Sequence, residues 1–383
     1  MNPPAAGQPA LEVLTNLRHL TGPRTGIEAY MEELVRALSG TGAVQLTALT
    51  WSPLGLDLPR VREAIPARRP DLAAGSLKAT VWKLWFDQWG CLRTARRGAG
   101  FLYHGMDGFL PYALRSRDRC VATIHDLGWQ VHPELYGRRV RTMYGALFPW
   151  VLRRADRFIA VSRYTADDLV RRAGVAASKI DVVYHGLDAA FTTVEAIGVA
   201  SHGAPADAPP YVLAVGGVSP RKNTRRLIEA FSRWRGRGGP RATYRLLITG
   251  MSLDPAFARD DTLPEGVALL GYVDKSELPR LYAGAAAFLY PGIYEGFGLP
   301  IIEAMACGAP VVTSSTGAAP EVAGGAALIV DPFDVASIEA GLERAILPEE
   351  AERLRALGRE RARAFRWDGA AQDTLAVYRR LRD

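Results

Sequence analysis

The chain has 383 residues, more than one ordinary hydrophobic core accommodates, so we expect two domains. A hydrophobic content of 48% with 23% charged residues is ordinary for a globular α/β protein. The three cysteines, Cys91, Cys120 and Cys307, are too few and too far apart for a disulfide framework or a zinc site, which favours a reducing, cytoplasmic location. Neither a secretory signal nor an apolar stretch of membrane-spanning length is recognisable.

Positive charge is concentrated in the first half of the chain. Residues 1–191 hold 25 Lys and Arg against 17 Asp and Glu, whereas the remainder holds 22 against 23. Such an excess predicts an anionic partner, such as a lipid phosphate, a membrane surface or a nucleic acid. An arginine-rich surface that only keeps the protein soluble explains the excess equally well, so both interpretations stay open.

The first half reads as an alternation of strands and helices. A strand is expected at residues 11–15, then a loop at 16–26 that contains Gly22 and Gly26, then a helical pattern. Further short β-type runs lie at residues 101–103, 120–124, 158–161 and 181–184. This alternation predicts parallel strands joined by crossover helices, and therefore a doubly wound sheet.

One helical segment in this half combines aromatic and basic residues. Residues 77–97 contain Trp82, Trp85 and Trp89 together with several Lys and Arg. The pattern fits an interfacial helix on anionic lipid. It also fits a core helix with a solvated basic face, which is the interpretation we adopt.

Polar residues follow two of the expected strands. His125 and Asp126 come directly after the strand at 120–124, and His185 comes after the strand at 181–184 and before a glycine turn. Such positions lie at the carboxyl edge of a parallel sheet, where ligands bind. A lone strand-end histidine is more often structural, and a simple turn explains His185 equally well.

Residues 192–209 are rich in Ala, Gly, Ser and Pro without a periodic apolar pattern, and we interpret them as a linker. The alternation restarts after them, with a helix expected at 227–234. The expected strands lie at residues 211–215, 244–248, 267–270, 286–290, 310–313 and 327–330. A second open α/β domain follows from this pattern.

The first of these strands leads into a glycine turn with two cations. Gly216 and Gly217 precede Arg221 and Lys222, which we place at the start of the next helix. Cations at a helix amino terminus oppose its dipole. Their presence there makes sense if a diphosphate binds beside them, although an exposed basic turn is the simpler alternative.

The richest segment is residues 290–308, in which a buried strand is followed by a glycine-rich loop and a helix. Glu295 lies in the loop, and we expect Pro300 at the first helical position and Glu303 in the first helical turn. A helix amino terminus favours anions, and carboxylates accept hydrogen bonds from hydroxyls. This loop therefore predicts a site that binds a ligand carrying both a phosphate and a sugar.

Together these motifs resemble the retaining glycosyltransferases of family 4, over nearly the whole chain. The resemblance rests on Glu295 and Glu303 with seven residues between them, on the Pro-Arg-Lys-Asn turn that ends at Asn223, and on His125-Asp126. The segments at 160–166, 269–273 and 365–381 add to it. The family implies the α/β GT-B fold, with two Rossmann-like doubly wound domains that face each other across a cleft.

The resemblance also implies a division of the chain. It predicts an acceptor-side domain at 1–191, the linker at 192–209, a nucleotide-sugar-binding domain at 210–365, and a closing helix at 366–383 that crosses back to the first domain.

Donor-binding roles follow from the resemblance. Glu303 should accept hydrogen bonds from the ribose hydroxyls, Glu295 should hold the donor sugar, and Arg221 and Lys222 should bind the diphosphate. The other donor-side residues implied are Gly217, Tyr272, Val273, Gly296, Phe297, Gly298 and Leu299. Gly217 departs from the family, because many relatives carry Arg or Thr there.

Catalytic roles are implied for His125, near the transferred sugar, and for Glu295, Arg221 and Lys222. The acceptor side would comprise Gly22, Gly26, Asp126 and His185. His185 stands where many relatives carry Asn, which leaves the choice of donor open.

The expected function is transfer of a hexose, with retention of configuration, from a nucleotide-diphosphate sugar to a glycan, glycolipid or small-molecule acceptor. GDP-mannose is the favoured donor, and UDP-sugar transfer is the alternative. The sequence lacks an Asp-x-Asp motif, so neither a metal nor another cofactor is expected. A non-transferring nucleotide-sugar enzyme and a binding subunit also remain as alternatives. No nucleic-acid partner is expected, but the basic amino-terminal domain admits peripheral contact with the inner face of an anionic membrane.

Overall fold

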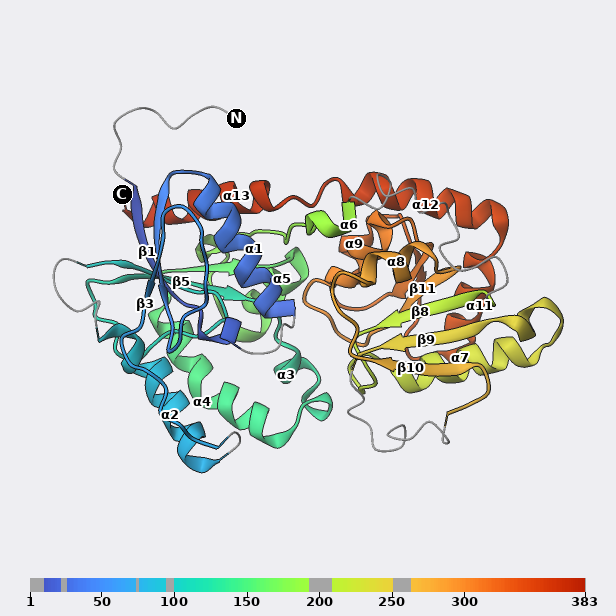
Figure 1. Ribbon diagram of the computed structural model, residues 1–383, viewed down its shortest axis with the longest axis horizontal. Helices are drawn as coiled ribbons and strands as arrows, with labels where there is room; N and C mark the ends of the chain where they lie inside the picture. Colours follow the sequence, from blue (N-terminus) through green and yellow to red (C-terminus); the bar gives the residue numbers. More distant parts are fainter. Residues whose placement is uncertain are drawn as a thin grey trace. The chain divides into compact units, whose positions relative to one another are not determined.

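The computed structural model describes residues 10–21, 26–73, 76–93, 100–192, 209–250 and 263–382, and the chain divides into two compact units (Figure 1). Unit 1 comprises residues 1–130, 136–186 and 367–383, and unit 2 comprises residues 131–135 and 187–366. The division falls after Gly186 rather than after position 191. Leu187 belongs to unit 2 because its N–H donates to the carbonyl of Phe365 at 3.0 Å.

Unit 1 is built on a seven-stranded parallel sheet with the order β3-β2-β1-β4-β5-β6-β7. Its strands are β1 (Leu11–Asn16), β2 (Val44–Leu49), β3 (Val61–Ala64), β4 (Leu102–Gly105), β5 (Arg119–Ile124), β6 (Arg157–Ala160) and β7 (Ile180–Val182). The helices that begin in this unit are α1 (Gly26–Gly40), α2 (Leu77–Gln88), α3 (Gly128–Val131), α4 (Arg138–Arg154), α5 (Arg163–Ala173) and α13 (Trp367–Arg382).

The core of unit 1 lies between α1, α13 and the sheet. Tyr30, Met31 and Leu34 recur at helical spacing on α1 and are buried. Leu375 and Tyr378 of α13 belong to the same apolar cluster. The last helix of the chain is therefore an integral part of unit 1, because its apolar stripe completes the covering of the sheet.

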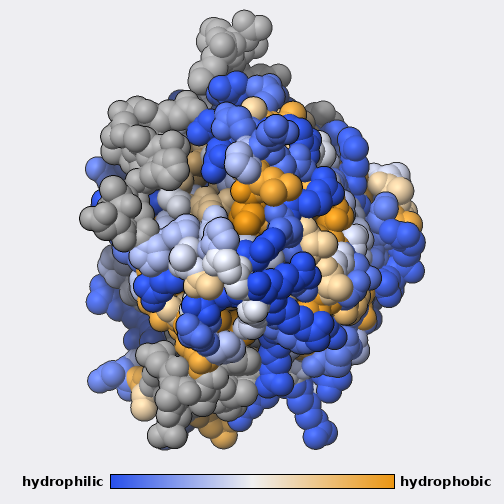
Figure 2. Space-filling model, turned by 90° about the vertical axis from the view of Figure 1, so that its right-hand side faces the viewer, coloured by the Kyte–Doolittle hydropathy of each residue, from blue (hydrophilic) through white to orange (hydrophobic). Residues whose placement is uncertain are grey.

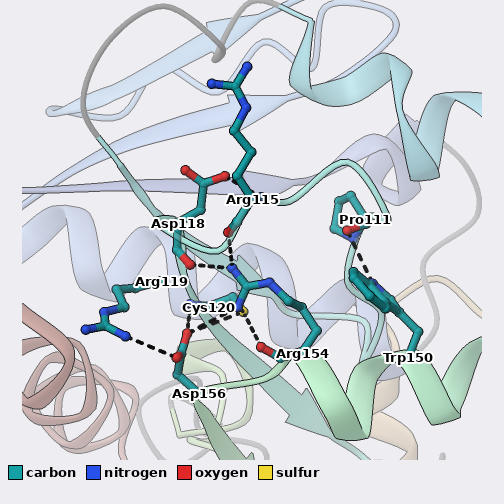
Figure 3. A network of polar contacts seen from close by, with 8 residues as sticks. All are labelled: Pro111, Arg115, Asp118, Arg119, Cys120, Trp150, Arg154 and Asp156. Carbon is teal, nitrogen blue, oxygen red and sulfur yellow. Dashed lines mark hydrogen bonds and ion pairs between the residues drawn. The ribbon is translucent and has the colours of Figure 1, made fainter.

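A polar network ties the start of β5 to α4 (Figure 3). The guanidinium of Arg154 donates to the Cys120 sulfur at 2.9 Å and to the carbonyl of Arg115 at 2.6 Å. The Cys120 N–H donates to Asp156 at 2.8 Å. Burial raises the pKa of the Cys120 thiol to about 12. This thiol is therefore a structural group, and Cys91 and Cys307 are likewise buried and free of disulfides.

Unit 2 is built on a six-stranded parallel sheet with the order β10-β9-β8-β11-β12-β13. Its strands are β8 (Tyr211–Val215), β9 (Arg245–Thr249), β10 (Val267–Gly271), β11 (Ala287–Tyr290), β12 (Val311–Ser314) and β13 (Leu328–Val330). Its helices are α6 (Ala189–Thr192), α7 (Thr224–Gly236), α8 (Leu278–Ala283), α9 (Leu299–Ala306), α10 (Ala319–Ala323), α11 (Val335–Ala345) and α12 (Pro348–Ala362).

The core of unit 2 gathers around the inner face of α7. Leu227, Phe231 and Trp234 are buried there together with residues of β8, β11 and β12. On the face of this unit shown in Figure 2, hydrophilic residues predominate and apolar residues form small separate patches. This is the surface expected of a globular domain with an internal core.

Candidate functional site

Each sheet has a point where the chain changes direction. In unit 2 the chain runs outward from β8 to β9 and β10, then returns to add β11 on the other side of β8. In unit 1 it runs from β1 to β2 and β3, then returns at β4. Ligands of open α/β sheets bind outside the carboxyl ends of the strands at such a switch point. The residues after β8 and β11, and after β1 and β4, are therefore the candidates.

In unit 2 the loops after β8 and β11 meet through an ionic cluster. One carboxylate oxygen of Glu295 lies 2.8 Å from the guanidinium of Arg221 and 2.8 Å from the ammonium of Lys222. Burial raises the pKa of Glu295, but the two cations outweigh burial and hold the pKa below its usual value. Glu295 is therefore ionised near neutral pH, and the cluster carries one net positive charge. The structure brings together two sequence-predicted motifs that lie about seventy residues apart in the chain.

The position of Lys222 is further fixed by Tyr290, the last residue of β11. The ammonium donates to the Tyr290 hydroxyl and lies 4.5 Å from the centre of its ring. An ammonium over an aromatic face is attracted by the ring quadrupole. We predicted Arg221 and Lys222 at the start of the helix. The structure places both in the turn before α7 instead. The helix begins later because Asn223 adopts a left-handed conformation with φ 58°.

The glycines after β8 are required by this geometry. Gly216 has φ 109°, and a Cβ atom there would lie 2.9 Å from the side chain of Lys222. Gly217 has φ 78°, and its N–H donates to the carbonyl of Thr249 at 2.7 Å. Positive φ values of this kind favour glycine over other residues. The pair therefore lets Lys222 fold back across the end of β8.

Glu303 lies on α9, but not where the sequence predicted. The helix begins at Leu299 after Gly298, whose φ is 99°, so Pro300 is its second residue and Glu303 falls beyond the first turn. The prediction placed the helix start one residue too late because it used Pro300 as the marker. Glu303 remains partly exposed and accepts a hydrogen bond from the Tyr282 hydroxyl at 3.0 Å. Burial raises its pKa to about 7, so this carboxyl titrates near neutrality.

The loop between the two carboxylates is held rigidly. Gly296, Phe297 and Gly298 are buried, and the ring of Phe297 packs edge-on against Phe365 at 5.7 Å. The carbonyl of Glu295 accepts a hydrogen bond from the Ala318 N–H at 2.9 Å. The Phe297 side chain therefore serves packing.

The remaining donor-side predictions lie on two other segments. Leu299 is partly exposed at the start of α9. Tyr272 and Val273 follow β10, the edge strand that β9 separates from β8. Tyr272 is 70% exposed, which leaves its ring accessible to a planar ligand.

In unit 1 the predicted histidines gather around Tyr30 of α1. The Tyr30 ring lies 4.8 Å from the rings of both His125 and His185, and His185 stacks on Trp367 at 6.0 Å. The Nε2–H of His125 donates to the carbonyl of Met106 at 2.7 Å. Burial lowers the pKa of both histidines, so both imidazoles are neutral near pH 7.

The other acceptor-side predictions are placed less tightly. Asp126 accepts a hydrogen bond from the Gly128 N–H at 2.9 Å, which shapes the turn into α3. Gly26 is the first residue of α1. Gly22 lies outside the described residues.

A buried polar chain connects this cluster to the last helix, and the sequence did not reveal it. The His104 ring bonds to the Tyr378 hydroxyl at 2.7 Å and to the Thr123 hydroxyl at 2.7 Å. Thr123 in turn bonds to Tyr30 at 2.9 Å. Burial lowers the pKa of His104 to about 3, so this chain is uncharged. The sequence signal that could have indicated this buried chain is His104 itself, a histidine within an apolar strand.

The switch point of unit 1 carries further polar residues that sequence reasoning missed. His19 follows β1 and lies 3.3 Å from Asp107, which follows β4, and 3.7 Å from Glu28 of α1. Burial raises the pKa of Asp107, but His19, Arg18 and the Phe109 N–H together outweigh burial and hold the pKa below its usual value. Position after a predicted strand was the signal that could have found His19 and Asp107.

Within the residues that the structure describes, His, Cys, Asp and Glu form no group of three or more that could hold a metal ion. Nor does that part contain a helix with both the length and the apolarity needed to cross a membrane.

Residues 24–191 match the family described as Glycosyltransferase Family 4, and residues 209–347 match the one described as Glycosyl transferases group 1. The chain is 30% identical to the O-antigen chain mannosyltransferase B of Escherichia coli over 388 aligned positions, which cover 94% of this chain and 97% of that protein.

Solved structures share the fold. Sucrose-phosphate synthase from Thermosynechococcus elongatus matches with a TM-score of 0.72 at 23% identity, covering 97% of this chain and 99% of that one. Anabaena HepE, solved with UDP and glucose, matches with a TM-score of 0.65 at 18% identity, covering 96% and 99%.

Proposed function

This chain belongs to glycosyltransferase family 4, and from that premise we propose that it transfers a hexose from a nucleotide-diphosphate sugar with retention of configuration and without a metal ion. Its two parallel-sheet units are the Rossmann-like domains of the GT-B fold. The proposed acceptor is a hydroxyl of a glycan, a glycolipid or a small molecule.

The observation that carries the proposal is the cluster of Arg221, Lys222 and Glu295 at the switch point of unit 2. Two fixed cations stand beside the end of β8, where a diphosphate would need them. Cations that are already oriented stabilise charge on a departing phosphate without reorganising during the reaction. Glu295 orients both cations and, in the proposal, accepts a hydrogen bond from the donor sugar.

The proposed reaction exchanges one bond at the anomeric carbon. The bond from this carbon to the β-phosphate oxygen breaks, and a bond to the acceptor oxygen forms on the same face of the sugar. The acceptor proton passes to the departing phosphate, which leaves as nucleoside diphosphate. Arg221 and Lys222 stabilise the charge that develops on this phosphate. His125, which is neutral, is proposed to hydrogen-bond the transferred sugar.

GDP-mannose is the proposed donor. Support comes from the mannosyltransferase of Escherichia coli that matches this chain along nearly its full length. A UDP-sugar is the second candidate, because the structurally similar HepE was solved with UDP and glucose. At 18% identity that likeness concerns the fold, and it does not outweigh the sequence match at 30% identity.

The test begins with a thermal-shift screen of GDP-mannose, UDP-glucose and their free nucleotides. Turnover is then followed as release of nucleoside diphosphate with and without candidate acceptors, and the anomeric configuration of the product is read by NMR. Arg221→Met should lower turnover by roughly 100- to 1,000-fold. Arg233→Met, on the exposed face of α7, is the matched control and should leave turnover unchanged. Equal release of nucleoside diphosphate without any acceptor would instead favour a non-transferring enzyme, and donor binding without any turnover would favour a binding subunit.

A further inference from the structure

The helix α4 has an unusual distribution of charge. It contains five arginines and no Asp or Glu in seventeen residues. Arg138, Arg139 and Arg141 stand at its amino-terminal end, where the helix dipole disfavours cations. All three are exposed, and no carboxylate of the described residues forms an ion pair with them. Intramolecular pairing therefore gives no reason for their placement.

The helix α2 presents apolar side chains on two opposite faces. Its inner face packs conventionally, since the Trp82 ring lies 5.4 Å from the rings of Trp51 and Phe86. Its outer face carries Leu77 and Val81, which are 79% and 57% exposed, together with Leu84 one turn further on at 40%. The core interpretation of this helix is thus right for Trp82 but leaves the outer stripe unexplained.

An exposed aromatic pair joins the two helices within unit 1. Trp89, at the carboxyl end of α2, stacks on Tyr112 with ring centres 6.0 Å apart. Tyr112 lies 5.0 Å from Trp150 of α4, and its hydroxyl lies 3.5 Å from the carbonyl of Ala146. Figure 1 shows α2 and α4 beside each other in unit 1, and Figure 3 shows Trp150 reaching from α4 toward Pro111. The carboxyl end of α2 therefore packs, through Tyr112, against the carboxyl-terminal half of α4.

We propose that the outer face of α2 and the amino-terminal end of α4 dock together on an anionic lipid bilayer. The interfacial surface is defined by the outer stripe of α2, with Leu77, Val81 and Leu84, and by the amino-terminal end of α4, with Arg138, Arg139 and Arg141. The apolar stripe enters the boundary between headgroups and acyl chains, and the arginines contact lipid phosphates. This inference concerns a partner of unit 1 and does not depend on the proposed donor or reaction.

Charge and polarity together select a bilayer over other occupants. Exposed Leu and Val gain little from a nucleic-acid backbone, whereas they gain from burial in an interface. A second copy of the same surface would place arginines against arginines, which is unfavourable. A bilayer with negative headgroups satisfies both the apolar stripe and the cations. The excess of positive charge in residues 1–191 acts in the same direction at longer range.

The test is sedimentation of the full chain with phosphatidylcholine vesicles that contain or lack phosphatidylglycerol, across a salt series. We expect binding to the anionic vesicles only, and weaker binding as salt rises. Replacing the three α4 arginines by Gln should weaken binding on the order of 100-fold, because each arginine near the surface contributes about five-fold. The matched control removes the same charge from unit 2, at Arg233, Arg353 and Arg363, and should bind far better than the α4 variant.

A second variant tests the apolar stripe without changing charge. Leu77→Gln with Leu84→Gln should weaken vesicle binding while thermal unfolding stays at the wild-type temperature, because both side chains are already exposed. Wild-type protein that stays in solution with anionic vesicles at low salt would overturn the proposal. Equal losses in the α4 variant and its control would overturn it as well, since net charge alone would then explain the binding.

Discussion

The titration of Glu303 should make the proposed donor binding depend on pH. Its pKa is raised to about 7, mainly by burial, while the Tyr282 hydroxyl acts in the opposite direction. If the donor ribose donates hydrogen bonds to this group, the ionised carboxylate is the better acceptor. Donor affinity should therefore rise as pH increases through about 7. Losing a hydrogen bond to a charged group weakens binding by about 1.5–3 kcal/mol, or roughly 10- to 150-fold.

Glu303→Gln is the sharpest perturbation, because the amide resembles the protonated carboxyl. The variant should bind donor much less tightly than wild type at about pH 8.5, and the two should converge at about pH 5.5, on either side of the pKa of about 7. The pH dependence of binding should vanish in the variant. In Tyr282→Phe the pH at which donor affinity is half-way through its rise should move upward, because the Tyr282 hydroxyl lowers the pKa of Glu303 in the wild-type protein.

The stability of the unliganded protein should change with pH in the direction opposite to donor affinity. The folded pKa of Glu303 is raised above the usual 4.5, so the folded state binds the proton more tightly than the unfolded state. The proton on Glu303 therefore stabilises the folded state. This contribution to the free energy of unfolding is fully present below about pH 4.5 and is lost as pH rises through about 7, and it amounts to about 3 kcal/mol. Glu303→Gln should therefore stabilise the empty protein at alkaline pH while it weakens donor binding.

Calorimetric titration of the nucleotide-sugar across this pH range, alongside urea unfolding, measures both effects. Glu352→Gln on α12 is the control, since Glu352 is 76% exposed. The reasoning is refuted if donor affinity keeps the same pH dependence in Glu303→Gln, or if that variant binds donor as tightly as wild type at alkaline pH.

Two further expectations concern the metal and the fold. Turnover should survive EDTA, because Arg221 and Lys222 supply the fixed cations; loss of turnover that magnesium restores would contradict this. Tyr378→Phe should lower the free energy of unfolding by about 1–3 kcal/mol, because it leaves the buried Nδ1 of His104 without its hydrogen-bond partner while the bond from Nε2 to Thr123 remains. Urea denaturation measures the loss, Tyr112→Phe at a partly exposed site is the control, and equal stability of both variants would show that the buried chain contributes little.

Much of the fold followed from local patterns in the sequence. The apolar runs at 120–124 and 286–290 became β5 and β11, because continuous apolar runs are typical of strands buried on both faces. The strands β2 (Val44–Leu49) and β3 both escaped notice; Val61–Ala64 is short, lies at the sheet edge and carries two charged residues. The Tyr378 contact with His104 could not be read from sequence either, because the two residues lie 274 positions apart in the chain.

The same limit applies to the site. Glycine turns and nearby charges marked Arg221, Lys222 and Glu295 separately, but no local pattern showed that one carboxylate would pair with both cations. Such pairing depends on the order of strands in the sheet, which places β11 beside β8. The predicted start of α9 was wrong for a related reason. The left-handed backbone at Gly298, and not Pro300, sets where the helix begins.

The pairing itself has a consequence for how the site would work. Two cations held side by side without a counter-ion would repel each other, and burying them would be costly. Glu295 removes that penalty while the site is empty and fixes both cations in position. It leaves one net positive charge, so in the proposed reaction a diphosphate would still meet an attractive field. The cations would then need no reorganisation when charge develops on the departing phosphate, which is the condition under which electrostatic stabilisation is most effective.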